Sequence, residues 1–225
     1  MRKIGSLAQK DENGQINPLK TNSLEVYSEN GDLKEKINSE GFYTVRHRDE
    51  YTSGEWVAPS GSPAPDSVTV TIGGIPYMML AYDGGSTEER KSNQFEIPHD
   101  LAIDLVNAET EKIEVHTHFL PSSNSAGVVK WFFDWVYLPP MGAAIPQTSL
   151  SFSYDIPVNK QYNHFLCGIE LPIPTGGFEI GGVILFSIRR TPSDAGDTYP
   201  SDALLLKVAL HVPSDGNGSR QRYIK

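Results

Sequence analysis

The sequence predicts an all-β protein in which two antiparallel sheets pack face to face as a sandwich, with a jelly roll as the favoured arrangement. Three observations predict this class. Runs of alternating apolar and polar residues recur after Ser67, and the 225 residues include 20 glycines and 16 prolines that divide the chain into short segments. No long amphipathic helix is evident in this part of the chain, so short strands joined by turns are expected.

Composition divides the chain into three regions. Residues 1–56 are polar and are predicted to form a small hairpin or extended region that anchors or assembles the protein. Residues 57–66 are rich in proline, serine and glycine, which predicts a linker. Residues 67–225 carry nearly all the strand signals and are predicted to form the sandwich domain.

The first region contains a hairpin signal. The runs 24–28 and 33–37 flank Asn30 and Gly31, and this dipeptide favours a tight turn because both residues tolerate positive φ. A short helix after Asp32 is the alternative. Since an isolated hairpin is only marginally stable in water, this region is expected to need a partner chain or the main domain.

The sandwich strands follow in order, each bounded by glycine, proline or polar turn residues. A hairpin turning at Gly73 and Gly74 comes first, and residues 100–108 are the one place where a turn or two of helix is expected. The predicted strands are 68–72, 75–82, 94–97, 112–120, 127–138, 148–156, 163–171, 178–190 and 203–212.

The segment 127–138 is rich in aromatic and β-branched residues, which favours a long strand over a buried helix. Trp131, Phe133, Trp135 and Tyr137 would lie on one face of this strand and pack into the core. The alternative is that Trp131, Trp135 and Tyr137 form a ligand-binding or interface surface on which sugar rings stack.

A histidine pair gives the sharpest enzymatic hypothesis. His116 and His118 would project from one face of a strand, as in metalloenzymes of the cupin kind, with His164 or His211 as a third ligand. The acid expected after the pair and the glycine expected before it are both absent. Because the opposite face of the strand is more apolar, we expect both imidazoles to point outward or into a subunit contact. No metal is therefore assigned, and His116, His118 and His211 remain candidate ligands.

Other motifs give no catalytic residue and no cofactor. The sequence has no Gly-x-Ser-x-Gly elbow and no phosphate-binding loop. The carboxylates Glu96, Asp100, Asp104 and Asp134 could form a glycosidase pair only if folding brings two of them together. Asp134 shares a strand face with Lys130, which indicates a salt-bridged or solvated face.

Charge and cysteine content limit the partners. A net charge of −9 argues against nucleic-acid binding by a basic surface. The single cysteine, Cys167, lies in an apolar stretch that predicts a buried thiol, and it excludes an internal disulfide. No apolar stretch is long enough to span a membrane.

Several segments together resemble virion structural proteins of tailed bacteriophages and prophages. The similarity covers about residues 56–225. The segments are Phe95–Asp100, Val115–Phe119, Gly127–Trp131 with Trp135 and Tyr137, Asp197–Tyr199 with Asp202–Leu205, and His211 with Gly218–Gln221.

The resemblance implies a non-enzymatic head fibre, capsid decoration protein or tail-associated protein. Such a protein would be located in the virion after assembly in the bacterial cytoplasm. Its expected partners are further copies of itself, with a trimer favoured, and capsid or tail proteins held through residues 1–56. A host surface glycan is a further possible partner. A cupin-like metalloenzyme and a carbohydrate-binding module remain the two alternatives.

Overall fold

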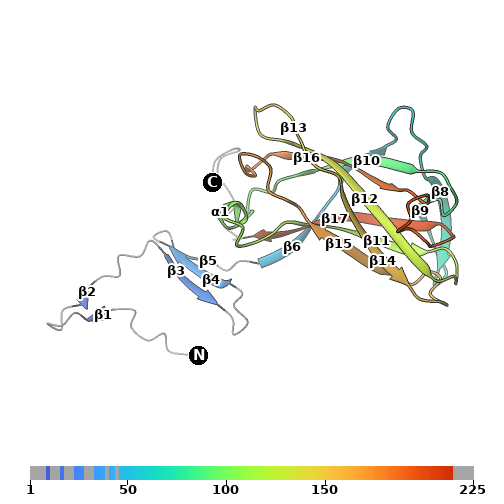
Figure 1. Cartoon of the computed structure of the whole chain (residues 1–225). Coiled ribbons are helices and arrows are strands. Elements are labelled where there is room, and N and C mark those ends of the chain that lie inside the picture. Colours follow the sequence, from blue (N-terminus) through green and yellow to red (C-terminus); the bar gives the residue numbers. More distant parts are fainter. Residues whose placement is uncertain are drawn as a thin grey trace. The chain divides into compact units, whose positions relative to one another are not determined.

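The computed structural model describes residues 46–214 and five short strands before them (Figure 1). The chain divides into two compact units, Met1–Val45 and Arg46–Lys225. In the first unit, β1 pairs with β2, and β3, β4 and β5 form an antiparallel sheet. These strands are β1 (Gln9–Lys10), β2 (Ile16–Asn17), β3 (Ser23–Tyr27), β4 (Leu33–Asn38) and β5 (Gly41–Tyr43).

The β3–β4 pairing confirms the hairpin predicted in the first region, with Leu24 opposite Ile37. The turn that joins the two strands lies outside the described residues.

The described part of the second unit holds one helix and twelve strands. The helix α1 (Ile103–Asn107) falls where one or two turns were predicted. No helix among the described residues has the length and apolar character needed to cross a membrane. The strands are β6 (Arg46–Tyr51), β7 (Ser53–Val57), β8 (Asp66–Ile72), β9 (Ile75–Tyr82), β10 (Glu89–Glu96), β11 (Glu114–Pro121), β12 (Gly127–Leu138), β13 (Ile145–Pro146), β14 (Leu150–Ile156), β15 (Phe165–Glu170), β16 (Val183–Arg190) and β17 (Ala203–Ser214).

Eight of these strands form a jelly roll, which confirms the predicted fold. One sheet has the order β9-β17-β11-β15, and the other has the order β10-β16-β12-β14. Successive strands alternate between the two sheets, except for the adjacent pair β12 and β14. All neighbouring strands are antiparallel. Because side chains alternate along each strand, each sheet turns one face toward the core.

The remaining strands extend the two sheets at their edges. β6 and β8 extend the first sheet, because β6 pairs with the second half of β17 and β8 pairs with β9. β7 pairs with β10 in the second sheet, and β13 pairs with β12. The predicted boundary at residue 56, between the N-terminal region and the rest of the chain, was therefore wrong. Residues 46–56, assigned to the N-terminal region, and Val57, assigned to the linker, belong to the sandwich, because they supply hydrogen-bonded strands at both sheets.

The core lies between the sheets, and alternation places the predicted rows there. Trp131, Phe133, Trp135 and Tyr137 are all buried, as expected for one face of β12. Phe133 stacks on Phe186 of the neighbouring strand β16, with ring centroids 4.9 Å apart. A face of aromatic rings stabilises the pairing of β12 and β16 beyond their backbone hydrogen bonds.

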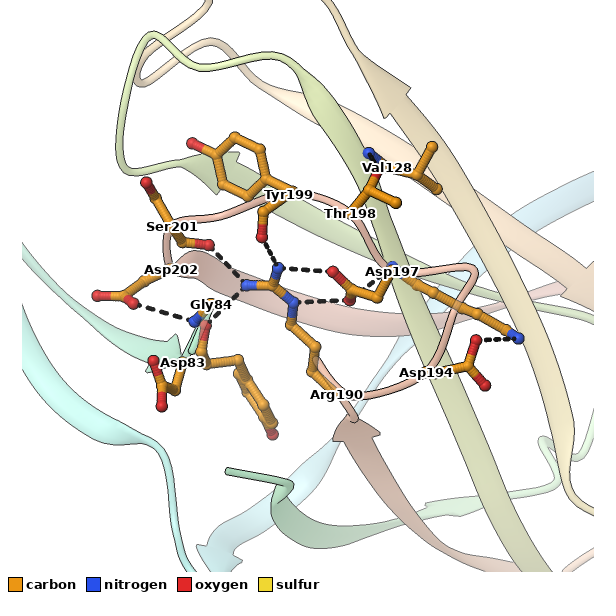
Figure 2. A network of polar contacts seen from close by, with 12 residues as sticks. Asp83, Gly84, Val128, Arg190, Asp194, Asp197, Thr198, Tyr199, Ser201 and Asp202 are labelled. Carbon is orange, nitrogen blue, oxygen red and sulfur yellow. Dashed lines mark hydrogen bonds and ion pairs between the residues drawn. The ribbon is translucent and has the colours of Figure 1, made fainter. Parts of the chain in front are cut away.

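A buried arginine ties the end of β16 to the loop before β17 (Figure 2). The Arg190 side chain is fully buried and forms a two-pronged ion pair with Asp197, with both N–H···O contacts at 2.8 Å. Its other N–H groups donate to the carbonyl oxygens of Tyr82, Tyr199 and Ser201. Every guanidinium donor therefore has an acceptor, which is the condition for burying this charge.

Candidate functional site

Five of the six histidines lie together on the outer face of the β6–β17–β11–β15 part of the first sheet. His116 and His118 project from β11 on the side opposite Val115, Thr117 and Phe119, which are buried in the interior. The rings form a continuous row. The centroid distances are 5.0 Å for His47–His211, 6.3 Å for His211–His116, 5.0 Å for His116–His118 and 5.0 Å for His118–His164.

The strand register explains how an acid from β6 reaches this row. Asp49 lies opposite His211 of β17, and His211 lies opposite Glu114 of β11. One row along, His116 has Ala209 on one side and Gly168 on the other. A Cβ at Gly168 would stand 2.6 Å from the Val115 carbonyl oxygen and 2.7 Å from His116 Cβ, so glycine is required beside His116. The small Ala209 lets Asp49 reach across β17 toward His116.

Hydrogen bonds hold the outer members of the row. His118 Nδ1 and His164 Nε2 are 2.8 Å apart, and His211 Nδ1 and Asp49 Oδ1 are 3.1 Å apart. The Asp49 oxygen also stands 3.7 Å from His116 Nε2. The Nε2 atoms of both His116 and His118 are buried and have no hydrogen-bond partner among the described residues.

Burial sets the charge state of this group. Desolvation lowers the pKa of His118 to about 4, with Lys207 and the neighbouring histidines acting in the same direction. Desolvation also lowers the pKa of His116. For Asp49, burial opposes ionisation. The hydrogen bond with His211 and the nearby positive groups outweigh it and hold the pKa below its ordinary value. At neutral pH the site therefore presents two neutral imidazoles and one carboxylate.

The prediction for the histidine pair was partly right. Both imidazoles lie outside the core, as expected, but they are 5% and 8% exposed and not surface groups. They converge with Asp49 on the outer face of the sandwich, whereas the cupin hypothesis places the metal inside. Of the two candidate third ligands, His211 hydrogen-bonds Asp49 and His164 hydrogen-bonds His118. Asp49 was missed because β6 was assigned to the anchoring region, although the alternating His47, Asp49 and Tyr51 could have indicated a strand.

The proposed ligand surface of Trp131, Trp135 and Tyr137 is not present. Trp131 and Tyr137 are fully buried and Trp135 is 3% exposed, so their faces cannot stack on a sugar. Alternation along β12 turns all three side chains toward the opposite sheet. The Tyr137 hydroxyl accepts a hydrogen bond from the Glu179 N–H at 2.6 Å, which satisfies its polar end in the interior.

Two of the four acidic residues considered for a glycosidase pair, Asp100 and Asp134, have structural partners. Asp134 binds Arg189 at 2.8 Å, and Lys130 binds Asp194 at 2.9 Å. The predicted ion-paired face is therefore present, but Lys130 and Asp134 pair with other residues and not with each other. Lys130 and Arg189 both also contact the ring of Phe132, which lies between them on this face. Asp100 binds Arg48 and Ser214 in a different part of the sandwich.

A groove of about 740 Å³ crosses the outer face of the second sheet. Its floor consists of two register rows from β10, β16 and β12. One row is polar and the other is mainly aliphatic. The rows are Ser92, Ser187 and Asp134, and Gln94, Leu185 and Val136. Residues Glu55 and Val57 of β7 border one side, and Pro146, Gln147 and Ser149 border the other.

The β8–β9 hairpin forms an apolar arm. The exposed fractions are 69% for Ile75, 53% for Tyr77 and 71% for Met78. β9 pairs with β17 only through its last three residues, so the part of the hairpin nearest the turn has no third strand among the described residues. Gly73 and Gly74 have φ values of 58° and 84°, which confirms the turn predicted from this dipeptide.

Comparison with known proteins gives loose structural likenesses. No protein-family model matches the chain, and no curated protein matches it. A carbohydrate-binding module specific for non-crystalline cellulose is 13% identical with a TM-score of 0.36, over 71% of this chain and 85% of that one. A module that recognises mannan is 14% identical with a TM-score of 0.34, over 74% and 98%.

A chain of infectious bursal disease virus, strain Gx, is 11% identical with a TM-score of 0.36, over 88% of this chain and 37% of the viral one. No functional conclusion follows from likenesses this distant. The resemblance to phage virion proteins therefore stays a prediction.

Proposed function

We propose that the protein is a non-enzymatic structural component of a bacteriophage particle, and that it assembles with copies of itself through the β8–β9 arm. The single observation that carries the self-association is the exposure of Ile75, Tyr77 and Met78 on a hairpin that projects past its sheet. Large apolar side chains grouped on one projecting element mark an interaction surface, because their exposure to water is unfavourable.

The shape of the arm fits a second copy of the chain as its occupant. β8 is the last strand of its sheet among the described residues, so its outer edge offers unpaired backbone N–H and C=O groups. A hairpin of two strands is marginal in water and gains stability from an added strand or an apolar cover. The arm of a second copy supplies both the added strand and the apolar cover. In a closed symmetric assembly, such as the expected trimer, the arm of every copy is covered in this way.

The division into two units supports a role in a larger particle. The first compact unit, residues 1–45, contains the short strands β1 to β5, and the second contains the sandwich strands β6 to β17. We propose that the first unit holds capsid or tail proteins while the sandwich is displayed on the particle. Attachment of the first unit to capsid or tail proteins would place the chain in the virion.

Light scattering on the purified full chain tests the self-association. We expect the wild type to be an oligomer at micromolar concentration and the double variant Tyr77→Ser, Met78→Ser to be a monomer. Met141→Ser is the matched control, because Met141 is 99% exposed but lies outside the arm, and it should leave the oligomer intact. A monomeric wild type would contradict the proposal.

The virion assignment needs a separate experiment. Mass spectrometry of purified phage particles should detect peptides of this chain at a constant ratio to the capsid protein. Deletion of residues 1–45 should remove the chain from the particles without unfolding the sandwich. A chain that stays in the soluble lysate while intact particles lack it would contradict the assignment.

A second candidate function is carbohydrate binding in the groove of the second sheet. The groove combines hydroxyl, amide and carboxylate groups with the aliphatic side chains of Leu185 and Val136, which suits a ligand with both polar and apolar faces. Calorimetric titration with a panel of host-surface glycans tests this function. A binding glycan should lose affinity at least tenfold in Ser187→Arg, where a long side chain fills the floor, and a flat response across the panel would remove the candidate.

A further inference from the structure

We propose that Asp49, His116 and His118 form a binding site for a divalent transition-metal ion such as zinc. One ligand atom from each of these residues lies within 4.8 Å of the other two. The set combines two imidazoles and one carboxylate, which are ligands that zinc and related ions accept in proteins. The proposal concerns binding alone, and it is independent of the virion assignment.

Two buried nitrogens without a partner in the described part of the chain point to a bound ligand. His116 and His118 are both more than nine-tenths buried, and no described residue hydrogen-bonds the Nε2 atom of either ring. A buried polar atom without a partner is unfavourable, and such atoms are rare in folded proteins. The two Nε2 atoms lie on adjacent rings, and Asp49 Oδ1 stands 3.7 Å from the Nε2 atom of His116. A single cation would satisfy both nitrogens and the carboxylate.

The surrounding hydrogen bonds orient the ligands for this purpose. If His118 Nδ1 donates to His164 Nε2, the lone pair of His118 Nε2 is free for an ion. His211 donates to Asp49 Oδ1 and fixes the carboxylate in the same way. Outer partners of this kind are typical of metal sites, where they hold the ring or carboxylate in the binding orientation.

The distances require only a small adjustment. Ligand atoms about 2.1 Å from a shared ion stand about 3–4 Å apart, so the three atoms have to approach by about an ångström. Asp49 can supply this movement, because its side chain is 30% exposed and lies on the edge strand β6. Water would complete the coordination. A bound ion would join β6 to β11 across β17 and strengthen the attachment of the strand that follows the N-terminal unit.

Lys207 is the group that opposes the site. It lies opposite His118 in the β11–β17 register, and its ammonium rests over the Tyr51 ring at 4.3 Å. This positive charge would weaken binding of a cation. Replacing it with an uncharged side chain of similar length should therefore increase the affinity for metal.

Binding is measured on the full-length protein, without a histidine tag, after treatment with EDTA. Titration with zinc in a calorimeter should show one ion per chain, and saturating zinc should raise the melting temperature. Cobalt should give an absorption spectrum typical of nitrogen and oxygen ligands. Failure to bind either ion at millimolar concentration would overturn the proposal.

Variants assign the site to these residues. Asp49→Asn and His118→Ala should each lower zinc affinity at least tenfold, whereas Lys207→Met should raise it severalfold. His99→Ala is the matched control, because His99 lies outside the row, and it should leave affinity unchanged. Circular dichroism identifies a variant that fails to fold. Lys207→Met should bind zinc more tightly, and a failure to fold cannot produce that gain in affinity. Zinc affinity that is equal in all four variants would overturn the assignment.

Discussion

Arg190 shows at the residue scale how this fold accommodates a buried charge. Its five N–H donors meet the Asp197 carboxylate and three backbone carbonyls, so burial leaves no donor without an acceptor (Figure 2). The Asp197 oxygen also accepts the Lys130 backbone N–H. The segment 197–199, singled out in the sequence for its resemblance to phage proteins, therefore has a structural role in holding the loop before β17.

Replacing Arg190 with Met should lower the free energy of unfolding by about 3–5 kcal/mol, because the Asp197 charge stays buried without its partner. Urea denaturation followed by tryptophan fluorescence measures this loss. Arg189→Met is a neighbouring control, since Arg189 is partly exposed and should cost much less. Equal losses in the two variants would contradict the role given to the buried pair.

Cys167 gives a second prediction at this scale. The thiol is buried, contacts the Thr117 hydroxyl, and has its pKa raised by burial to about 11. Because the thiolate is the reactive form, alkylation by iodoacetamide at pH 8 should be at least about tenfold slower in the folded protein than in urea. Comparable rates in the two conditions would show that the thiol is accessible.

At the element scale, alternation along each strand decides which side chains are essential. β16 illustrates this, because Ile184 is fully buried between the sheets and the next residue, Leu185, is 38% exposed in the groove. Both are large aliphatic residues, so sequence composition alone does not separate their contributions. Their positions on opposite faces of the sheet do.

Ile184→Ala should lower the free energy of unfolding by about 2–5 kcal/mol, since it leaves a cavity in the core. Leu185→Ala should cost less than about 1 kcal/mol, because its side chain is already in contact with water. Thermal and urea denaturation of the pair give the comparison. A larger loss for Leu185 than for Ile184 would contradict the assigned faces.

At the scale of the whole molecule, the important difference from prediction is where the sandwich begins. β6 covers one edge of β17, and β7 covers one edge of β10. Residues 46–56, which hold β6 and nearly all of β7, were assigned to the anchoring region because that region is polar. Polar composition is normal for edge strands, which face water on one side, so composition misplaced this boundary.

Two truncations test the boundary. Residues 46–225 alone should melt within a few degrees of the full chain, because every strand of the sandwich is kept. Residues 58–225 should melt at least about 10 °C lower or aggregate, because two sheet edges lose their covering strands. If both truncated proteins melted at the same temperature, residues 46–57 would have no structural role in the sandwich.

The sequence by itself determined the sandwich class, both hairpins and the buried faces of the long strands. Alternation and turn chemistry are local properties of the sequence. The strand predicted over residues 127–138 therefore has the same bounds in the structure. Tertiary structure alone decided that Arg190 finds Asp197 and three carbonyls, that Asp49 reaches the His116 and His118 pair, and that the exposed apolar residues gather on one arm. These placements depend on which strands become neighbours in the jelly roll, and neighbours far apart in the chain leave no local pattern in the sequence.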